Sequence, residues 1–172
     1  MPAAAPKILG NKIQWQIGSM LGSGTTGEVY EAQAINLDDA EVIAVKMVKL
    51  MHPIHGLDQQ KLKAVKKEIQ RYRELEHRHI VKYYDSEIIE NNVLCIYLEY
   101  QPTSIVKVYT DYEKIGEGNA RRYTRQVLKA LEYLHRNNVI HGDLKGANLL
   151  VNKDGTEIKL CDLGNSLMIN TT

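Results

Sequence analysis

The stretch from Val139 to Val151 constrains this chain most, because it sets charged and amide side chains between two apolar runs. It reads V-I-H-G-D-L-K-G-A-N-L-L-V and contains Asp143, Lys145 and Asn148. The apolar flanks predict two buried β segments, so that the loop is held at both ends and its side chains can converge on one point. Phosphoryl transfer requires a carboxylate for the attacking hydroxyl, a cation for the migrating group and an oxygen ligand for Mg²⁺. A plain polar turn between strands is the alternative interpretation.

Three further motifs accompany this loop. Cys161-Asp162-Leu163-Gly164 lies downstream of it, and two stretches lie upstream: Gly22-Ser23-Gly24-Thr25-Thr26-Gly27-Glu28-Val29 and Ile43-Ala44-Val45-Lys46. The four motifs, in this order, resemble the signature set of protein kinases. The resemblance covers the chain from about Trp15 to about Ser166.

This resemblance implies an α+β fold with two lobes: a complete small lobe with a five-stranded antiparallel sheet and one helix, and a partial, helical large lobe. We expect a flexible N-terminus over residues 1–14, the small lobe with its hinge over 15–101, and the catalytic loop and start of the activation segment within 102–172. Because the chain ends soon after Gly164, we expect the remaining activation segment and the later large-lobe helices to be missing from it.

Composition agrees with one ordinary folded domain. The chain has 172 residues, of which 44% are hydrophobic and 25% charged, and its net charge of +1 does not indicate binding to nucleic acid or to a charged membrane surface. Cys95 and Cys161 lie in apolar, strand-like runs, which predicts buried thiols in a reducing compartment. We find no signal peptide and no apolar run of transmembrane length, and we therefore expect a cytoplasmic protein.

The glycine-rich stretch has three interpretations. Glycines let the backbone approach phosphates closely, but a lone glycine motif also occurs in dinucleotide-binding folds and in plain hairpins. The dinucleotide-binding fold opens a helix directly after the glycines, whereas Glu28 to Ala32 alternates as a strand does. The pattern therefore favours a flap between the strand Trp15–Leu21 and a returning strand over Val29–Ala34, and it argues against a dinucleotide-binding oxidoreductase.

Lys46 follows the apolar run Val42–Val45 inside a strand predicted over Glu41–Leu50, and a buried lysine is costly unless its charge is paired. The amphipathic pattern of Gln59–Glu76 predicts a helix, and Glu68 lies beside its apolar stripe. We expect Glu68 to pair with Lys46. A lysine on a solvated strand face is the alternative.

The remaining elements follow from periodicity and breakers. We expect a polar turn over Asn36–Ala40 and a loop over Met51–Asp58 with Pro53 and Gly56 as breakers. We expect strands over Tyr83–Glu90, Val93–Glu99 and Ile158–Leu160, with turns at Asn91-Asn92 and Asp154-Gly155. We expect a short helix over Ser104–Tyr112 and, after an interruption of regular structure at Gly116 and Gly118, a long helix from an N-cap at Asn119 to Asn138. The long helix should have an apolar stripe that begins at Ala120 and a solvated face with Arg121, Arg122 and Arg125.

The kinase resemblance implies a role for each site residue. Asp143 would orient the acceptor hydroxyl, Lys145 would stabilise transferring charge, and Asn148 and Asp162 would bind Mg²⁺. Lys46, oriented by Glu68, would bind the phosphates of ATP. The other expected nucleotide contacts are Leu21, Gly22, Gly24, Gly27, Val29 and Ala44, with backbone groups of Glu99 and Gln101 at the adenine.

Two residues depart from the family pattern. Gly142 stands where the family has an arginine that usually binds the phosphorylated activation segment, which puts phosphorylation control in question. Leu163 stands where the family has phenylalanine, and we expect a mild effect because leucine stays apolar with less volume.

The loop Asp143 to Asn148, with Arg121 to Gln126 before it, is similar to the MAP kinase kinase kinase group. The resemblance implies an ATP- and Mg²⁺-dependent serine/threonine kinase whose protein substrate could be a MAP kinase kinase. The alternative function is a weak or inactive kinase relative that acts as a nucleotide-binding or interaction module.

Overall fold

The computed structural model describes residues 15–24, 27–35, 42–52, 56–89 and 92–169. By its internal contacts the chain divides into two units. The first unit comprises residues up to Ile69 together with Tyr83–Tyr100, and the second comprises Gln70–Lys82 together with the chain from Gln101 onward. The terminal segment 1–14, the turn expected over Asn36–Ala40 and part of the turn at Asn91-Asn92 lie outside the described residues.

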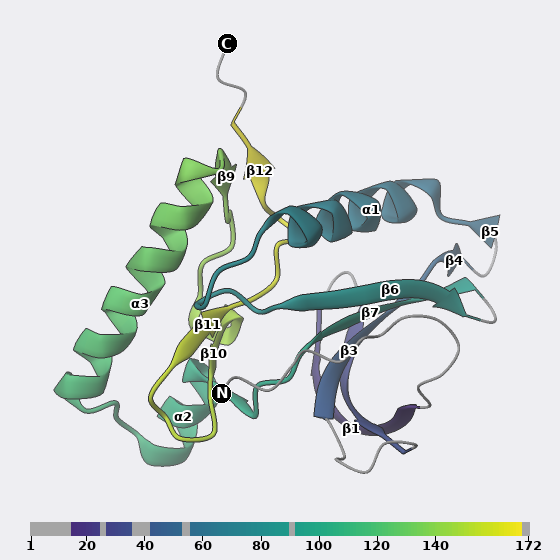
Figure 1. Ribbon diagram of the computed structural model, residues 1–172. Helices are drawn as coiled ribbons and strands as arrows, with labels where there is room; N and C mark the ends of the chain where they lie inside the picture. The colour runs from purple at the N-terminus through teal and green to yellow at the C-terminus, as the bar shows by residue number, and fades with distance from the viewer. Residues whose placement is uncertain (1–14, 25–26, 36–41, 53–55, 90–91, 170–172) are drawn as a thin grey trace. The chain divides into compact units, whose positions relative to one another are not determined.

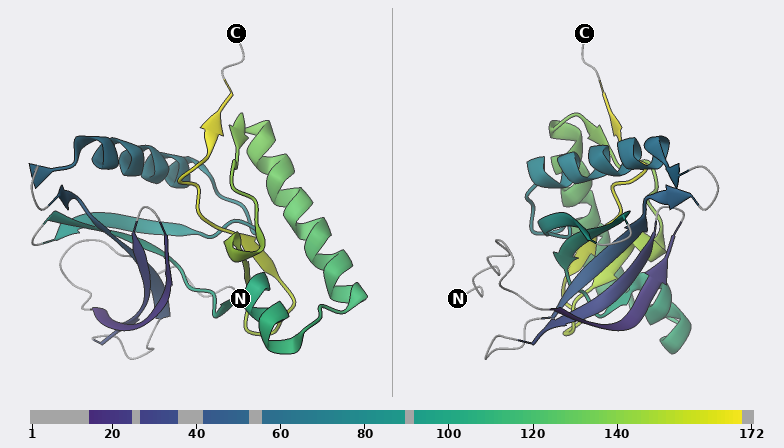
Figure 2. Two further views of the ribbon diagram at one scale, coloured as in Figure 1. Left: turned by 180° about the vertical axis from the view of Figure 1, so that it is seen from behind. Right: turned by 90° about the vertical axis from the view of Figure 1, so that its right-hand side faces the viewer.

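The first unit is built on an antiparallel sheet of five strands in the order β1-β2-β3-β7-β6 (Figure 1). The strands are β1 (Trp15–Ser23), β2 (Glu28–Ala34), β3 (Val42–Lys49), β6 (Tyr83–Ile89) and β7 (Val93–Glu99). Figure 2 shows the twist of this sheet from two further sides. The five-stranded antiparallel sheet expected of the small lobe is therefore confirmed.

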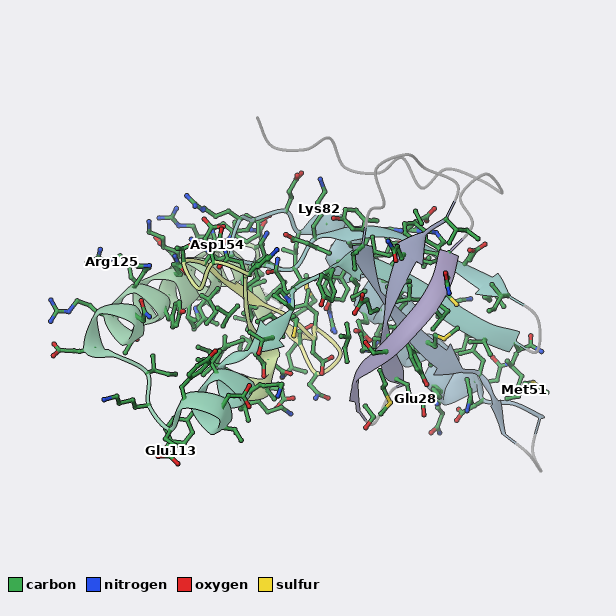
Figure 3. The ribbon with its side chains drawn as sticks, turned by 90° about the horizontal axis from the view of Figure 1, so that it is seen from below. Glu28, Met51, Lys82, Glu113, Arg125 and Asp154 are labelled. Carbon is green, nitrogen blue, oxygen red and sulfur yellow. The ribbon has the colours of Figure 1, made fainter. Side chains whose placement is uncertain are left out.

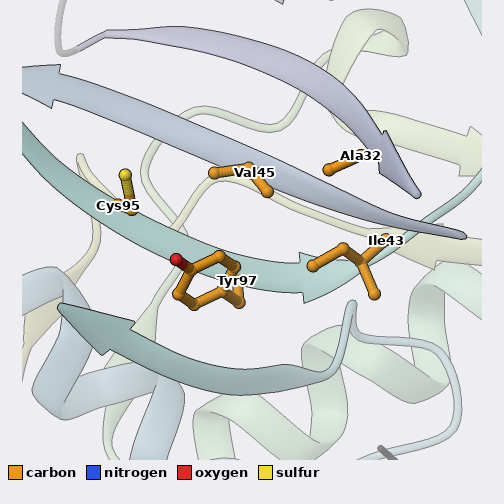
Figure 4. Close-up of a cluster of buried hydrophobic side chains, with 5 residues drawn as sticks. All are labelled: Ala32, Ile43, Val45, Cys95 and Tyr97. Atoms are coloured by element: carbon orange, nitrogen blue, oxygen red, sulfur yellow. The ribbon is translucent and has the colours of Figure 1, made fainter. Parts of the chain in front are cut away.

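One face of the sheet carries a hydrophobic cluster, because alternate side chains of a strand point to the same side. The cluster consists of Ala32, Ile43, Val45, Cys95 and Tyr97 (Figure 4). Trp15, which is half-buried, stacks on Tyr97 with ring centroids 6.2 Å apart. The intervening residues Ala44 and Lys46 therefore point to the opposite face.

Helix α1 (Gln59–Glu74) follows two very short strands, β4 (Met51–His52) and β5 (Gly56–Leu57). The loop expected over Met51–Asp58 is wrong at its two ends, where β4 and β5 pair antiparallel. Residues 53–55, with the expected breaker Pro53, lie outside the described residues. The helix begins where Asp58 Oδ1 accepts a hydrogen bond from the Lys61 N–H at 2.9 Å, which satisfies one of the free N–H groups of its first turn.

The apolar stripe predicted for this helix is buried except at Leu62, which is half-buried. Val65 is fully buried, and Ile69, Tyr72 and Leu75 are each at most 8% exposed. The boundary between the two units falls within this helix, after Ile69.

The second unit contains two helices and two small sheets. The helices are α2 (Ile105–Tyr112), capped by the Ser104 hydroxyl, and α3 (Glu117–Arg136). One sheet has the order β11-β10-β8, and the other pairs β12 with β9. Their strands are β8 (Thr103–Ser104), β9 (Val139–Ile140), β10 (Leu149–Val151), β11 (Ile158–Leu160) and β12 (Leu167–Met168).

Helix α3 begins earlier than the sequence predicts. Its N-cap is Gly116, so Asn119 is not the cap and Gly118 lies inside the first turn rather than breaking the chain. The early start is compatible with a pair four residues apart, in which Arg121 Nη2 lies 2.7 Å from Glu117 Oε1. Ala120, expected on the apolar stripe, is exposed.

The buried stripe of α3 packs on the small sheet. Tyr123 forms a core cluster with Val151 and Ile158, and its hydroxyl donates to the Gly155 carbonyl at 2.7 Å. The arginines expected on the solvated face are exposed, and Figure 3 shows Arg125 on the outer side of this helix. The packing thus ties the Asp154-Gly155 turn to α3.

The segment after α1 extends the small sheet of the second unit. The Leu160 N–H donates to the His79 carbonyl, and the Val81 N–H donates to the Leu160 carbonyl, each at 2.9 Å. These bonds explain why Gln70–Lys82 belongs to the second unit although the chain before it belongs to the first.

Two smaller expectations concern cysteines and membranes. Both cysteines are free thiols, but only Cys95 is buried; Cys161 is half-buried, which corrects the expectation for it. None of the helices in the described part of the chain is long and apolar enough to cross a bilayer.

Candidate active site

The loop between β9 and β10 is held at both ends, as its apolar flanks predict. Ile140 pairs with Leu167 in β12, and Leu149 pairs with Leu160 in β11. Between them, Gly146–Asn148 forms a turn of 3₁₀ helix. This turn brings the side chain of Asn148 back toward the start of the loop.

Three polar side chains of the loop meet there. Lys145 Nζ lies 2.7 Å from Asp143 Oδ2, and Asn148 Nδ2 donates to the same Oδ2 at 3.1 Å. Asn148 Nδ2 also donates to the Asp143 backbone carbonyl at 2.8 Å. The three residues singled out by sequence therefore lie together, with the carboxylate partly exposed and Asn148 buried.

These contacts set the ionisation of the carboxylate. The hydrogen bond from Lys145 lowers the pKa of Asp143, and bonds from the Asn148 and Asn165 side chains lower that pKa further. The same contact raises the pKa of Lys145. At neutral pH the carboxylate can accept a hydrogen bond from a hydroxyl group, and the ammonium beside it can bind an anionic group.

His141 supports this loop, and the sequence analysis did not place it among the site residues. Its ring is 2% exposed and lies between two backbone groups. Nδ1 accepts from the Asp143 N–H at 3.3 Å, so Nε2 carries the proton and donates to the Cys161 carbonyl at 2.9 Å. A histidine at the end of an apolar run, two residues before the carboxylate, is the signal that could have indicated this role.

Gly142 is required by the backbone as it stands. Its φ is 79°, and a Cβ at this position would lie 2.5 Å from the Asn165 carbonyl oxygen. Gly142, which stands where the family has an arginine, thus allows the turn after Leu163 to approach the loop closely.

Asp162 lies next to the loop in the same unit. The Cys161 N–H donates to the Asn148 carbonyl at 3.0 Å, which joins the two segments that carry the predicted Mg²⁺ ligands. Among the described residues, the side-chain hydrogen bonds of Asn148 are all made by Nδ2, and no donor bonds to Oδ1. An amide oxygen and the Asp162 carboxylate are the hard oxygen donors that Mg²⁺ prefers, and Mg²⁺ commonly takes one or two carboxylates plus substrate phosphates. The residues present therefore fit this ion.

The first unit holds the other predicted charge pair. Lys46 Nζ lies 2.7 Å from Glu68 Oε1, and both side chains are buried. On the sheet, Val29 is directly opposite Lys46, and Ala44 is two residues away on the same face. The structure thus brings together three residues predicted to contact the nucleotide, Val29, Ala44 and Lys46, and places the predicted partner Glu68 against Lys46.

The glycines of the first unit are not equivalent. A Cβ on Gly27 would lie 2.4 Å from the Met47 carbonyl oxygen, so packing alone requires this glycine. A Cβ on Gly22 would meet nothing within 4 Å, and one on Gly24 would meet only the Gly27 carbonyl oxygen at 4.0 Å. Leu21, beside them, is 39% exposed. Packing thus explains Gly27 but not Gly22 or Gly24, whose contact with a nucleotide stays a prediction.

The predicted adenine contacts belong to separate units. Glu99 ends β7 in the first unit, whereas Gln101 lies in the second. Both residues are half-buried. Their part in binding stays a prediction.

Comparison with known proteins bears on the whole chain. The family model for the protein kinase domain matches residues 15–172. This chain belongs to the protein kinase domain family. The resemblance inferred from its four motifs is thereby confirmed.

Several curated relatives of this kinase chain are MAP kinase kinase kinases. It is 42% identical to mitogen-activated protein kinase kinase kinase 3 of Arabidopsis thaliana, over 87% of this chain and 24% of the relative. It is 35% identical to mitogen-activated protein kinase kinase kinase 3 of Mus musculus, over 92% of this chain and 25% of the relative. It is also 43% identical to cell division control protein 7 of Schizosaccharomyces pombe, over 90% of this chain and 14% of the relative. The chain spans a quarter or less of the length of these relatives.

Proposed function

We propose that this kinase chain transfers the γ-phosphoryl group of ATP to a serine or threonine hydroxyl of a protein. The observation that carries the proposal is the cluster of Asp143, Lys145 and Asn148, in which a carboxylate of lowered pKa lies 2.7 Å from an ammonium. Lys145 two residues after Asp143 is the form of this loop that resembles serine/threonine kinases, and MAP kinase kinase kinases are among the curated relatives.

In the second unit, Asp143 Oδ accepts a hydrogen bond from the acceptor hydroxyl and orients its oxygen for attack. The ammonium of Lys145, already beside that carboxylate, stabilises the negative charge that develops on the transferring group. His141 keeps the backbone of Asp143 in place through its bond to the N–H. Asn148 Oδ1 and the Asp162 carboxylate would hold Mg²⁺, and the bound ion would supply positive charge to neutralise the phosphates.

In the first unit, Lys46 binds the phosphates of ATP. Its contact with Glu68 gives the buried ammonium an ion-pair partner and orients it. Gly22 and Gly24 let backbone N–H groups come close to the phosphates, and Leu21, Val29 and Ala44 provide apolar surface for the rest of the nucleotide. Backbone groups of Glu99 and Gln101 bind the adenine.

The remaining expectations form part of the same proposal. The small lobe with its hinge spans residues 15–101, and the large-lobe part spans 102–172. The protein substrate is a MAP kinase kinase, in line with the names of several relatives. The site of action is the cytoplasm.

The test is a phosphoryl-transfer assay with radiolabelled MgATP and a mixed serine, threonine and tyrosine peptide set. Asp143→Asn serves as the catalytic variant, and Lys153→Ala, an exposed lysine in the turn before β11, as the matched control. We expect label on serine and threonine, a fall in kcat of about 10²- to 10⁴-fold for Asp143→Asn, and little change in nucleotide affinity. Labelling that is equal in wild type and Asp143→Asn, or that appears only on tyrosine, would refute the proposal.

A further inference from the structure

The backbone of Asp162 has a conformation that needs support from its surroundings. Its φ is 63°, in the left-handed region that residues with a side chain rarely adopt. Such a conformation costs free energy and persists only where neighbouring groups over-determine it. The groups around Asp162 should therefore include some that hold its backbone.

The hydroxyl of Tyr72 is such a group. Its oxygen accepts a hydrogen bond from the Asp162 N–H at 3.0 Å and a longer one from the Leu163 N–H at 3.4 Å. Successive N–H groups of a turned backbone point to a common centre, which an oxygen can occupy. Tyr72 is 3% exposed and Leu163 is fully buried, so water does not compete freely for these bonds.

The carbonyl of Leu163 is held from the other side. It accepts from the Ser166 hydroxyl at 2.6 Å, from the Ser166 N–H at 3.1 Å and from Arg71 Nη1 at 3.4 Å. Arg71 and Tyr72 are neighbours in the last turns of α1, in the same unit as Asp162. The end of α1 therefore contributes to both sides of this short backbone segment.

We propose that Tyr72 is a positioning residue for Asp162: its hydroxyl holds the backbone turn that aims the metal-binding carboxylate. The consequence for the metal rests on the proposed function, whereas the hydrogen bonds that hold the turn do not. A phenylalanine would keep the aromatic ring, but it would leave the buried N–H of Leu163 and the half-buried N–H of Asp162 without this acceptor. The hydroxyl, and not the ring, is therefore the part of Tyr72 that the proposal concerns.

Amide hydrogen exchange tests the bonds directly, in the full chain without nucleotide or metal. In wild type the Asp162 and Leu163 amides should be protected. In Tyr72→Phe both should exchange at least about tenfold faster, the loss expected for a hydrogen bond, while the Leu160 amide, bonded to His79, stays protected. The matched control is Tyr133→Phe, whose hydroxyl accepts from the Glu76 N–H at 3.0 Å in the same unit; it should leave Asp162 and Leu163 unchanged. Unprotected wild-type amides would overturn the proposal even if Tyr72→Phe did not fold, and so would equal protection in Tyr72→Phe.

Calorimetric titration tests the positioning role. Tyr72→Phe should weaken the binding of Mg²⁺ in the presence of a non-hydrolysable ATP analogue by about 10- to 100-fold, the usual effect of removing a group behind a metal ligand. Its affinity for the analogue without metal should match that of wild type and of Tyr133→Phe. Equal Mg²⁺ affinity in Tyr72→Phe and wild type would overturn the positioning role. If wild type binds no nucleotide, the proposed function fails, and the exchange rates still decide whether Tyr72 holds the turn.

Discussion

Lys46 Nζ and Glu68 Oε1 lie 2.7 Å apart, with the two side chains only 8% and 1% exposed. The pair joins the middle of β3 to α1, and it places a lysine charge beside the apolar side chains of Ala44, Val48 and Ile96 on the same face of the sheet. Removing water from two charges is expensive, and their attraction offsets the cost only while both are present.

Removing one charge of this pair should therefore lower the free energy of unfolding more than replacing both charges with apolar side chains. We expect Glu68→Leu and Lys46→Met each to lower the free energy of unfolding by about 3–5 kcal/mol, because each leaves one buried charge alone. The double variant should be clearly more stable than the sum of the two losses predicts. Denaturant unfolding of all four proteins measures the coupling, and strictly additive losses would show that the two charges do not stabilise each other.

The pKa of Asp143 should depend on Lys145. The Lys145 contact lowers that pKa, so Lys145→Ala should raise it toward the ordinary value of about 4. Because the folded-state pKa is the lower one, stability that this carboxylate contributes is present above its unfolded pKa and is lost as pH falls below about 4. Titration of the ¹³C carboxyl signal is the measurement. Lys153→Ala should leave the signal unchanged, and an unshifted pKa in Lys145→Ala would contradict the assignment.

Restoring a side chain at Gly142 should destabilise the second unit. Gly142→Ala places Cβ 2.5 Å from the Asn165 carbonyl oxygen, and it requires alanine to adopt a φ of 79°, which is unfavourable for a residue with a side chain. We expect a loss of at least about 1–3 kcal/mol, and a larger one for Gly142→Arg. The control is Gly118→Ala in α3, where a Cβ meets nothing within 4 Å and helix propensity should raise stability by up to about 1 kcal/mol. A gain in stability for Gly142→Ala, seen by thermal melting, would rule out this reading of the loop.

Mild acid should weaken the second unit through His79. Burial is the main cause that lowers the pKa of this histidine, and its Nδ1 lies 3.2 Å from the Ile158 carbonyl. A histidine with a lowered folded-state pKa favours the fold fully above its unfolded value of about 6.5 and loses that contribution as pH falls below it. His79→Asn keeps a donor near the carbonyl but cannot titrate. Its unfolding midpoint should fall less between pH 7.5 and 5.5 than that of wild type; some dependence should remain, because burial also lowers the pKa of His77. An equal fall of the unfolding midpoint in His79→Asn and wild type would exclude His79 as the source of the acid sensitivity.

Local patterns predicted most of the elements correctly. The sequence located the five strands of the main sheet to within a residue or two. The alternation of polar and apolar residues indicated the mostly exposed β1, whereas continuous apolar runs indicated β3 and β7, which are buried along most of their length. The failures lie where the pattern is weak. The small pair β4 and β5 has too few residues to alternate, and the N-cap of α3 is a glycine although a better capping residue, Asn119, follows.

The sequence alone determined the family, the strand and helix types, and the loop in which Asp143, Lys145 and Asn148 meet, because these depend on spacings of a few residues that local geometry turns into contacts. Only the tertiary structure decided that Tyr72 contacts Asp162, that His141 bridges Asp143 and Cys161, and that Gly142 accommodates Asn165. Those contacts join segments 20 to 90 residues apart. Periodicity predicts that a side chain is buried, but it does not predict which residues that side chain packs against. The left-handed backbone at Asp162 can be recognised only once the groups that hold it are in place.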